Sequence, residues 1–221
     1  MSVGAVLVAA GRGERLGSER PKAFIRLGDR PLLAESLERL ESSAWIESIV
    51  VAAPPEWEEP VILLAEELGC GKVAEVVTGG ESRAESVRAA AAVVPESTLV
   101  ILVHDAARPL LAEEVIERVL APLSEGWDGA VPGLPLADTV KRVEGETVIE
   151  TVDRSSLVAV QTPQAFAAEI LRTALEGEVA AASDCSSLVE RRGGRVKVVP
   201  GDPRLLKVTT EADLERIAAL L

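Results

Sequence analysis

Tyrosine and asparagine are absent from this 221-residue sequence, which also has one histidine, one methionine and two cysteines. Cys70 and Cys185 form no CxxC pair and no histidine-containing metal spacing, so we expect both thiols to be buried and reduced. No apolar run approaches the roughly 18 residues of a membrane-spanning helix, so we expect no contact with a membrane. The first residues lack the basic segment of a secretion signal, and we therefore expect a cytoplasmic protein.

Basic residues are in the minority. The chain has 36 acidic and 23 basic side chains, which gives a net charge of −13. Such a charge repels the phosphates of nucleic acids, so we expect no nucleic-acid partner, although a small anionic ligand can still bind in a local basic cleft. A chain of this length can bury a substantial core, and a single domain spanning residues 1–221 is the simplest organisation.

The basic residues gather in the stretch of residues 5–27. It reads AVLVAAGRGERLGSERPKAFIRL and joins an apolar run to a glycine-rich turn and five basic side chains. Val6, Leu7 and Val8 show no polar alternation, which predicts a strand buried on both faces of a parallel sheet. Glycines in the turn allow backbone amides to approach an anion closely. The stretch therefore predicts a polyphosphate site at the end of a first strand, although such turns also occur for purely structural reasons.

Two common nucleotide-binding motifs do not fit this turn. The dinucleotide pattern GxGxxG needs glycine at position 16, where the chain has Leu16. The phosphate-loop pattern GxxxxGK followed by Ser or Thr is absent throughout the sequence. A nicotinamide-dependent dehydrogenase is therefore disfavoured, and the phosphate site belongs to another class of protein.

Apolar runs alternate with helical patterns along the rest of the chain. The expected strands after the first are residues 48–53, 73–77, 99–103, 129–132, 157–161 and 196–199. The expected helices are residues 31–42, 59–68, 81–94, 111–123, 165–175 and 179–191, with a last helix from Glu211. This alternation indicates parallel strands joined by right-handed crossovers. Ligands of such sheets bind beyond the carboxyl ends of the strands, where the loops rich in Gly, Asp or Arg can converge.

The pattern changes from Asp138 onward. Residues 138–143 and 147–152 are rich in Thr, Val and Ile without a helical period and flank Glu144-Gly145-Glu146, which predicts a hairpin. An isolated hairpin is marginally stable in water, so it has to pack against something. We expect a β-arm at about residues 136–156 that is used in forming a homodimer.

Seven segments resemble, in the same order, those of a known family. They are AAGRGERLGSERPK (9–22), GGESRAESV (79–87), VHDAARP (103–109), DTVKR (138–142), TVDRSSL (151–157), TPQAF (162–166) and LKVTTEADL (206–214). Together they resemble the 2-C-methyl-D-erythritol 4-phosphate cytidylyltransferases of the non-mevalonate isoprenoid pathway. AAGxGxR alone marks nucleotidyltransferases in general, whereas its combination with VHDAARP and TVDR is more specific. The resemblance implies an α/β fold with a Rossmann-like, GT-A-like, mostly parallel twisted sheet flanked by helices and a protruding β-arm.

The resemblance also implies roles for individual residues. The residues implied to bind CTP are Ala9, Ala10, Gly11, Gly13, Arg15, Lys22, Gly80, Glu81, Ser86 and Asp105. Arg15 and Lys22 would contact the phosphates as catalytic residues, and Asp105 would also be a metal ligand. The residues implied to bind the acceptor, a polyol phosphate, are Arg108, Thr139, Arg154 and Lys207. Thr139 and Arg154 would reach it across the homodimer.

The implied reaction suits a chain with one histidine. A phosphate monoester oxygen attacks the α-phosphorus of CTP and pyrophosphate leaves, and this nucleophile is already anionic near neutral pH, so positioning and charge stabilisation carry the catalysis. Arg15 can bind two phosphate oxygens at once, whereas Lys22 acts as a compact charge. The implied cofactor is Mg²⁺ or another divalent cation, which would neutralise the triphosphate.

The chain departs from the family pattern at two positions. Ala23 stands where glutamine often follows the Pro-Lys pair, and Cys185 follows Asp184 where a second acidic residue is usual. The second departure argues against a metal site around Asp184.

The residues alone leave other interpretations open. His104 is expected to be a structural residue at a strand end, because the proposed chemistry gives it no task. Asp105 can equally be a carboxylate paired with Arg108, and Arg154 and Lys207 can be solvated surface charges. Two other functions also remain: cytidylyl transfer to another polyol phosphate such as ribitol 5-phosphate, and a non-catalytic nucleotide-binding regulator with the same fold.

Overall fold

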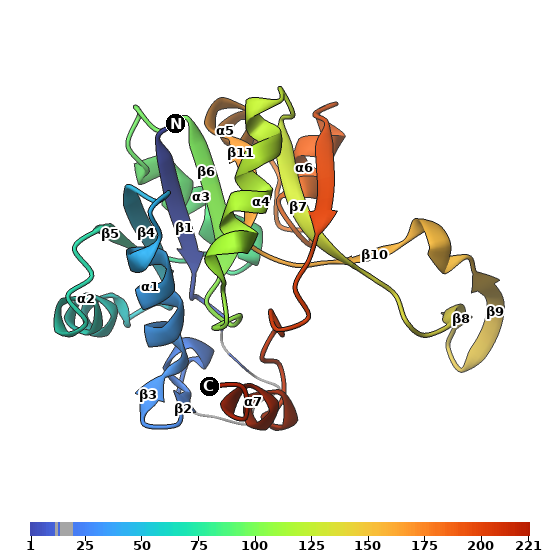
Figure 1. Ribbon diagram of the computed structural model, residues 1–221, viewed down its shortest axis with the longest axis horizontal. Coiled ribbons are helices and arrows are strands. Elements are labelled where there is room, and N and C mark those ends of the chain that lie inside the picture. The colour runs from blue at the N-terminus through green and yellow to red at the C-terminus, as the bar shows by residue number, and fades with distance from the viewer. Residues whose placement is uncertain (12, 14–19) are drawn as a thin grey trace.

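A mostly parallel sheet forms the centre of the molecule (Figure 1). The structure is a computed structural model that describes residues 1–11, 13 and 20–221. The sheet strands are β1 (Val3–Val8), β4 (Ser48–Ala53), β5 (Val73–Thr78), β6 (Val100–Asp105), β7 (Gly129–Pro135), β10 (Val158–Val160), β11 (Gln164–Ala167) and β12 (Val196–Pro200). Their order is β10-β7-β11-β6-β1-β4-β5, with β12 paired to β7. Only β10 and β11 run antiparallel to their neighbours, so the predicted sheet is confirmed.

Strand β1 lies between β4 and β6 and is parallel to both. Val6 packs into the apolar cluster on one face of the sheet and Leu7 into the cluster on the other, and neither is exposed. A strand buried on both faces needs such a continuous apolar run. Each side chain of this kind contributes about 1.5–3 kcal/mol to the free energy of folding.

Helices cover both faces of the sheet (Figure 1). One face carries α1 (Leu32–Ser42), α2 (Glu58–Glu67) and α4 (Glu113–Ser124), and the other carries α3 (Arg83–Val93), α5 (Ala168–Ala174) and α6 (Ser186–Arg191). In α1, the fully buried Leu33, Leu37 and Leu40 recur at helical spacing. None of the helices in the described part of the chain is long and apolar enough to span a bilayer.

Two segments differ from the sequence prediction. The helix predicted over residues 165–175 is wrong at its start, because its first residues form β11 and α5 begins only at Ala168. Strand β11 fills the space between β6 and β7 and pairs antiparallel with both. A short apolar run does not distinguish a strand from a buried helix, so the neighbouring strands decide. The helix predicted over residues 179–191 is likewise shortened to its C-terminal half, α6.

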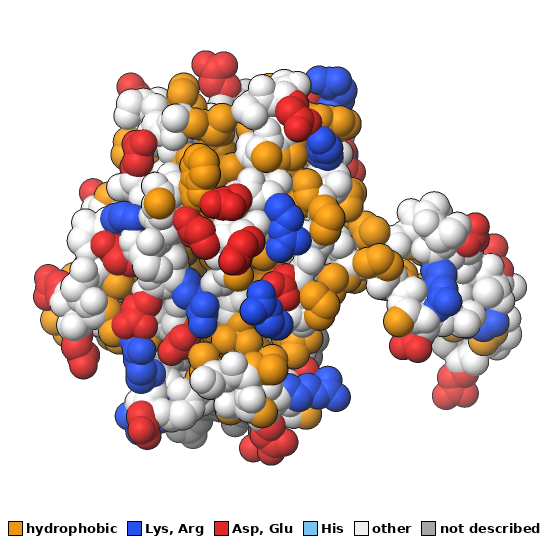
Figure 2. All heavy atoms as spheres, viewed as in Figure 1, with side chains coloured by type: hydrophobic (Ala, Val, Ile, Leu, Met, Phe, Trp, Pro, Cys, Tyr) orange, Lys and Arg blue, Asp and Glu red, His pale blue; other side chains and the backbone are white. Residues whose placement is uncertain are grey.

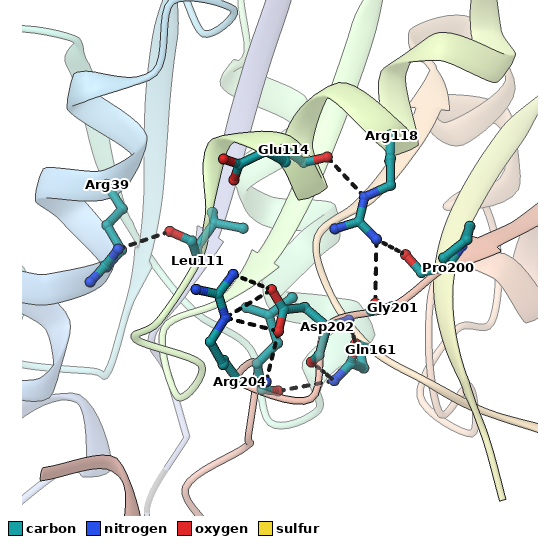
Figure 3. A network of polar contacts seen from close by, with 10 residues as sticks. Arg39, Leu111, Glu114, Arg118, Gln161, Pro200, Gly201, Asp202 and Arg204 are labelled. Carbon is teal, nitrogen blue, oxygen red and sulfur yellow. Dashed lines mark hydrogen bonds and ion pairs between the residues drawn. The ribbon is translucent and has the colours of Figure 1, made fainter. Parts of the chain in front are cut away.

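A polar network fastens the segment between β12 and α7 (Glu211–Ala218) to the body of the molecule (Figure 3). The buried amide of Gln161 donates to the carbonyls of Asp202 at 2.9 Å and Leu205 at 3.3 Å, and it accepts the Asp202 N–H at 3.0 Å. Arg118 of α4 donates to the carbonyl of Pro200 at 2.6 Å. Helix α7 then docks on a small apolar cluster of Leu27, Leu32, Leu110, Val208 and Ile217.

The predicted hairpin is confirmed as β8 (Val140–Glu144) and β9 (Thr147–Val152), a separate antiparallel pair that projects from the body as an arm (Figure 1). Figure 2 shows hydrophobic side chains along the neck between the body and the arm. On the hairpin, Val143, Val148 and Ile149 are each more than half exposed. No described residue of the same chain covers these apolar side chains.

Candidate active site

The loops after β1, β5 and β6 line one cleft of about 1020 Å³ at the carboxyl edge of the sheet. The C-terminal segment adds Lys207 and Thr209 to its wall. Parallel strands bring their following loops together at this edge, so the predicted convergence is confirmed. The predicted site residues that line the cleft are Ala9, Ala10, Gly11, Gly13, Lys22, Gly80, Glu81, Ser86, Asp105 and Lys207.

The turn after β1 is held by backbone hydrogen bonds. The Ala9 N–H donates to a carbonyl of β4 at 2.9 Å, and the Lys22 N–H donates to the carbonyl of Gly11 at 3.2 Å. Gly13 has φ +73°, and a Cβ there would lie 3.0 Å from the Cβ of Lys22. Glycine therefore suits both the backbone conformation and the space at this position. Arg15, the other predicted phosphate contact, lies outside the described residues.

The loop between β5 and α3 forms another wall. The Ser82 hydroxyl accepts the Glu85 N–H at 3.2 Å while the Glu85 carboxylate accepts the Ser82 N–H at 2.8 Å, a capping box that fixes the start of α3. The buried hydroxyl of Ser86 accepts the Gly80 N–H at 3.1 Å and donates to the Ser82 carbonyl at 2.9 Å. A Cβ on Gly80 would lie 2.4 Å from the Cβ of Glu85, so the loop needs glycine there. The sequence predicts Ser86 as a ligand contact. In the structure its hydroxyl fixes the shape of the loop.

Asp105 is the last residue of β6, and two cations hold its carboxylate. Arg83 Nε donates to Oδ1 at 2.8 Å, and Lys207 Nζ donates to Oδ2 at 2.7 Å. Burial by itself raises the pKa of Asp105, but the charges of Arg83 and Lys207 outweigh it and hold that pKa well below its usual range. A carboxylate has about four lone-pair sites. Asp105 is therefore ionised at neutral pH and retains acceptor sites beyond its two ion pairs.

The single histidine, His104, is fully buried and does not line the cleft. Its Nδ1 lies 3.2 Å from the Thr162 hydroxyl, and its Nε2 lies 3.1 Å from the carbonyl of Arg108. The Thr162 hydroxyl also accepts the Asp105 N–H at 3.1 Å, so its own proton points to Nδ1 and the imidazole proton sits on Nε2. Burial lowers the pKa of His104 to about 4. The contacts fit the structural role that the sequence predicts.

Arg108, a predicted acceptor contact, is placed away from the lining of the cleft. Its Nη1 donates to the Leu205 carbonyl at 2.6 Å, and its buried Nε has no hydrogen-bond partner among the described residues. The Val208 N–H donates to the Ala107 carbonyl at 2.9 Å. These bonds hold the C-terminal segment beside the loop after β6 and thereby bring Lys207 to the cleft.

Thr139 and Arg154, the other predicted acceptor contacts, belong to the arm. Thr139 directly precedes β8 and Arg154 follows β9, so both are carried away from the sheet with the arm (Figure 1). Both side chains are exposed, and Arg154 donates to the carbonyl of Ala137. A single chain does not bring them to the other predicted residues.

A divalent cation in the cleft would have few protein ligands. The described residues contain no group of three or more His, Cys, Asp or Glu side chains with metal-binding geometry. The carboxylate of Asp184 already accepts from Gln164 at 2.9 Å and Ser186 at 2.7 Å. Mg²⁺ is often bound by one or two carboxylates together with substrate phosphates. The ionised Asp105 in the lining of the cleft fits such a site.

Arg83 is the residue that the sequence prediction misses. It lines the cleft, contacts Asp105 and begins α3. A cation at the N-terminus of a helix is unfavourable toward the helix dipole. Such a local conflict indicates that the side chain contacts a group elsewhere in the fold. An arginine in the first turn of a predicted helix was therefore the sequence feature that could have identified Arg83.

The whole chain resembles proteins of one family. A family model described as 2-C-methyl-D-erythritol 4-phosphate cytidylyltransferase matches residues 3–221. A curated relative with that name from Frankia casuarinae is 44% identical and covers 99% of this chain and 81% of the relative. Another, from Nocardia farcinica, is 43% identical and covers 100% of this chain and 94% of the relative.

Solved structures agree with the sequence matches. The 2-C-methyl-D-erythritol 4-phosphate cytidylyltransferase of Thermus thermophilus has a TM-score of 0.77 at 34% identity and covers 97% of this chain and 96% of its own. A structure described as 4-diphosphocytidyl-2C-methyl-D-erythritol synthase has a TM-score of 0.83 at 32% identity and covers 99% and 98%. The chain therefore belongs to the 2-C-methyl-D-erythritol 4-phosphate cytidylyltransferase family.

Proposed function

We propose that the chain transfers the cytidylyl group of CTP to 2-C-methyl-D-erythritol 4-phosphate, giving 4-diphosphocytidyl-2-C-methyl-D-erythritol and pyrophosphate. Family membership over residues 3–221 supports the reaction and both substrates. The observation that carries the proposal is the cleft, where a glycine-rich loop, Lys22, Lys207 and the Asp105 carboxylate line one space. Lys22, Lys207 and Arg83 outnumber the carboxylates of Asp105 and Glu81 there, which favours anionic substrates in a chain of net charge −13.

The loop of Gly80, Glu81 and Ser86 is assigned to the cytosine end of CTP. Gly80 has no side chain, so its backbone can approach the edge of a base closely. Carboxylate and carbonyl oxygens accept from the exocyclic amine of cytosine, which uracil lacks. A site built for that donor disfavours UTP, because its acceptors are left unpaired.

The triphosphate is assigned to the turn of Ala9, Ala10, Gly11 and Gly13. Backbone N–H groups at such turns form concave anion sites. Lys22 at the end of the turn supplies a compact positive charge. Arg15 remains the predicted second cation of this site.

The reaction forms one bond and breaks one bond at the α-phosphorus. An oxygen of the acceptor phosphate bonds to it, the bond to the bridging oxygen of the β-phosphate breaks, and the electron pair leaves with pyrophosphate. The nucleophile is already anionic, so no protein group has to remove a proton. The chain therefore aligns the two phosphates and offsets the charge of the transition state through Lys22 and Lys207. His104 is neutral and outside the cleft, which agrees with this division of labour.

The proposed cofactor is Mg²⁺ or another divalent cation, with Asp105 as its protein ligand. When bound, such a cation neutralises the triphosphate and stabilises the leaving pyrophosphate. Asp105 suits it because the carboxylate is ionised and oxygen is the ligand that Mg²⁺ prefers.

The acceptor side of the site is proposed to need a second copy of the chain. Lys207 lines the cleft and Arg108 donates to the Leu205 carbonyl two residues before it, whereas Thr139 and Arg154 lie on the arm. A homodimer in which the arm reaches the cleft of the other copy would unite them. In this proposal residues 1–221 are one domain, and the exposed apolar side chains of the arm at about residues 136–156 contribute to the dimer contact. A cytoplasmic location also stays a prediction.

The test is pyrophosphate release from each of the four nucleoside triphosphates, with Mg²⁺ and a panel of polyol phosphates. We expect release with CTP and 2-C-methyl-D-erythritol 4-phosphate, and its loss in excess EDTA. Release only with ribitol 5-phosphate would replace the proposed acceptor. CTP binding without turnover of any acceptor would instead indicate a nucleotide-binding regulator.

A further inference from the structure

Among the described cations that line the cleft, Arg83 is one to which the proposed reaction gives no task. Its guanidinium joins two elements that are far apart in the sequence. Nε donates to Asp105 Oδ1 at 2.8 Å, at the end of β6, and Nη1 donates to Cys185 Sγ at 3.5 Å, at the start of α6. The side chain is 19% exposed, so these contacts lie in a largely dry environment.

The two anchors fix the plane of the guanidinium. Its five N–H donors have a rigid planar arrangement, so contacts through Nε and Nη1 determine its orientation. Cys185 is 0% exposed and Asp105 is 5% exposed, so both anchors are part of the packed interior. The buried Nη2 has no hydrogen-bond partner among the described residues. An unpaired buried donor is destabilising, so stability alone does not account for arginine at this position.

The second cation on Asp105 is held differently. Lys207 comes from the C-terminal segment and its side chain is 39% exposed, twice as much as that of Arg83. Lysine has a flexible stem and one charged atom, so Lys207 can turn toward a substrate phosphate. Arg83 would then be the contact that still holds the carboxylate.

We infer that Arg83 is a positioning residue that fixes the Asp105 carboxylate at the cleft while Lys207 binds the acceptor phosphate. The inference rests on the proposed function, because it concerns the same site. A purely structural alternative is that Arg83 only fastens α6 to the sheet through Cys185. The two roles differ because a positioning residue acts through Asp105 and a fastening residue does not.

The first test compares Arg83→Lys and Arg83→Ala with the wild type. Arg83→Lys keeps the charge but cannot contact Asp105 and Cys185 in the same planar geometry. We expect its kcat to fall about 10-fold with KM for CTP changed less than about 3-fold, and Arg83→Ala to lose about 100-fold, the range found for residues that orient ligands in metal sites. Millimolar guanidinium should restore part of the Arg83→Ala activity. Arg88→Ala is the matched control, because Arg88 lies on the same helix and donates to the surface carbonyl of Gly177 at 3.0 Å.

The second test uses Asp105→Asn as a background. If Arg83 acts through Asp105, Arg83→Ala lowers kcat by less than about 2-fold further in this background, because coupled residues are not additive. The inference would be overturned if the losses of kcat from Arg83→Ala and Asp105→Asn multiplied in the double variant. Wild-type kinetics for both Arg83→Ala and Arg83→Lys would also overturn it. Crystal structures with the acceptor bound, when Lys207 contacts its phosphate, give a readout independent of turnover: the Asp105 carboxylate should keep its position in the wild type and rotate in Arg83→Ala. An inactive wild type would defeat the proposed function, and an unmoved Asp105 in Arg83→Ala would defeat the role of Arg83 alone.

Discussion

Acidification from pH 7 to pH 5 should destabilise this protein through His104. Burial lowers the pKa of His104 from its ordinary value of 6.5 to about 4. Between these values the unfolded chain binds a proton that the folded chain excludes, so protons favour the unfolded state. The contribution to stability is therefore complete above pH 6.5 and is lost as the pH falls toward 4.

The two pKa values set the size of the effect. Proton linkage predicts that the free energy of unfolding is about 2 kcal/mol smaller at pH 5 than at pH 7. Carboxylates with lowered pKa values, such as Asp105, add little here because they titrate below this window. For a urea dependence of about 2 kcal/mol per molar, the midpoint of unfolding should move down by about 1 M.

The assay is urea unfolding of the protein without a polyhistidine tag at pH 7 and pH 5. Because the chain has one histidine, its imidazole NMR signal needs no assignment. That signal should stay at its neutral position down to pH 5. In His104→Gln, the difference between the two pH values should shrink to a few tenths of a kcal/mol, because the titrating group is gone. Titration of the signal near pH 6.5, or equal stability at both pH values in the wild type, would refute the reasoning.

Three further predictions follow from the cleft and the arm. Arg15→Ala and Lys22→Ala should each lower kcat about 100-fold or more without unfolding, as with loss of one oxyanion donor, and near-normal kinetics would remove that residue from catalysis. Gly79→Ala should cost about 1–3 kcal/mol in urea unfolding, because its Cβ would lie 2.2 Å from the Cβ of Ala10; an unchanged midpoint would contradict this close approach. Ile149→Asp should shift the proposed dimer toward monomer in sedimentation experiments and raise the KM of the acceptor, whereas an unchanged dimer would place the contact elsewhere.

Much of the fold follows from local patterns. The strand Ser48–Ala53 has the predicted bounds, and the predicted first strand becomes β1, because an uninterrupted apolar run suits a strand buried on both faces. The glycines of the loop after β1 also point directly to an anion site, since their effect on the backbone is local. The family resemblance supplied most other predicted residues of the cleft, including Lys207, which periodicity alone describes as a surface lysine, but not Arg83.

Other features depend on contacts between distant segments. A short apolar sequence at Gln164–Ala167 is compatible with helix or strand, and the space between β6 and β7 makes it a strand. No local pattern connects Arg83 with Asp105, which are 22 residues apart, or turns Arg108 toward the carbonyl of Leu205.

The sequence by itself therefore determined the order of most strands and helices, the glycine-rich loop after β1 and the family. The tertiary structure decided which charges meet in the cleft and which side chains the arm carries away from it. The physical reason is that backbone preferences act over a few residues, whereas burial and ion pairing depend on which distant segments share one space.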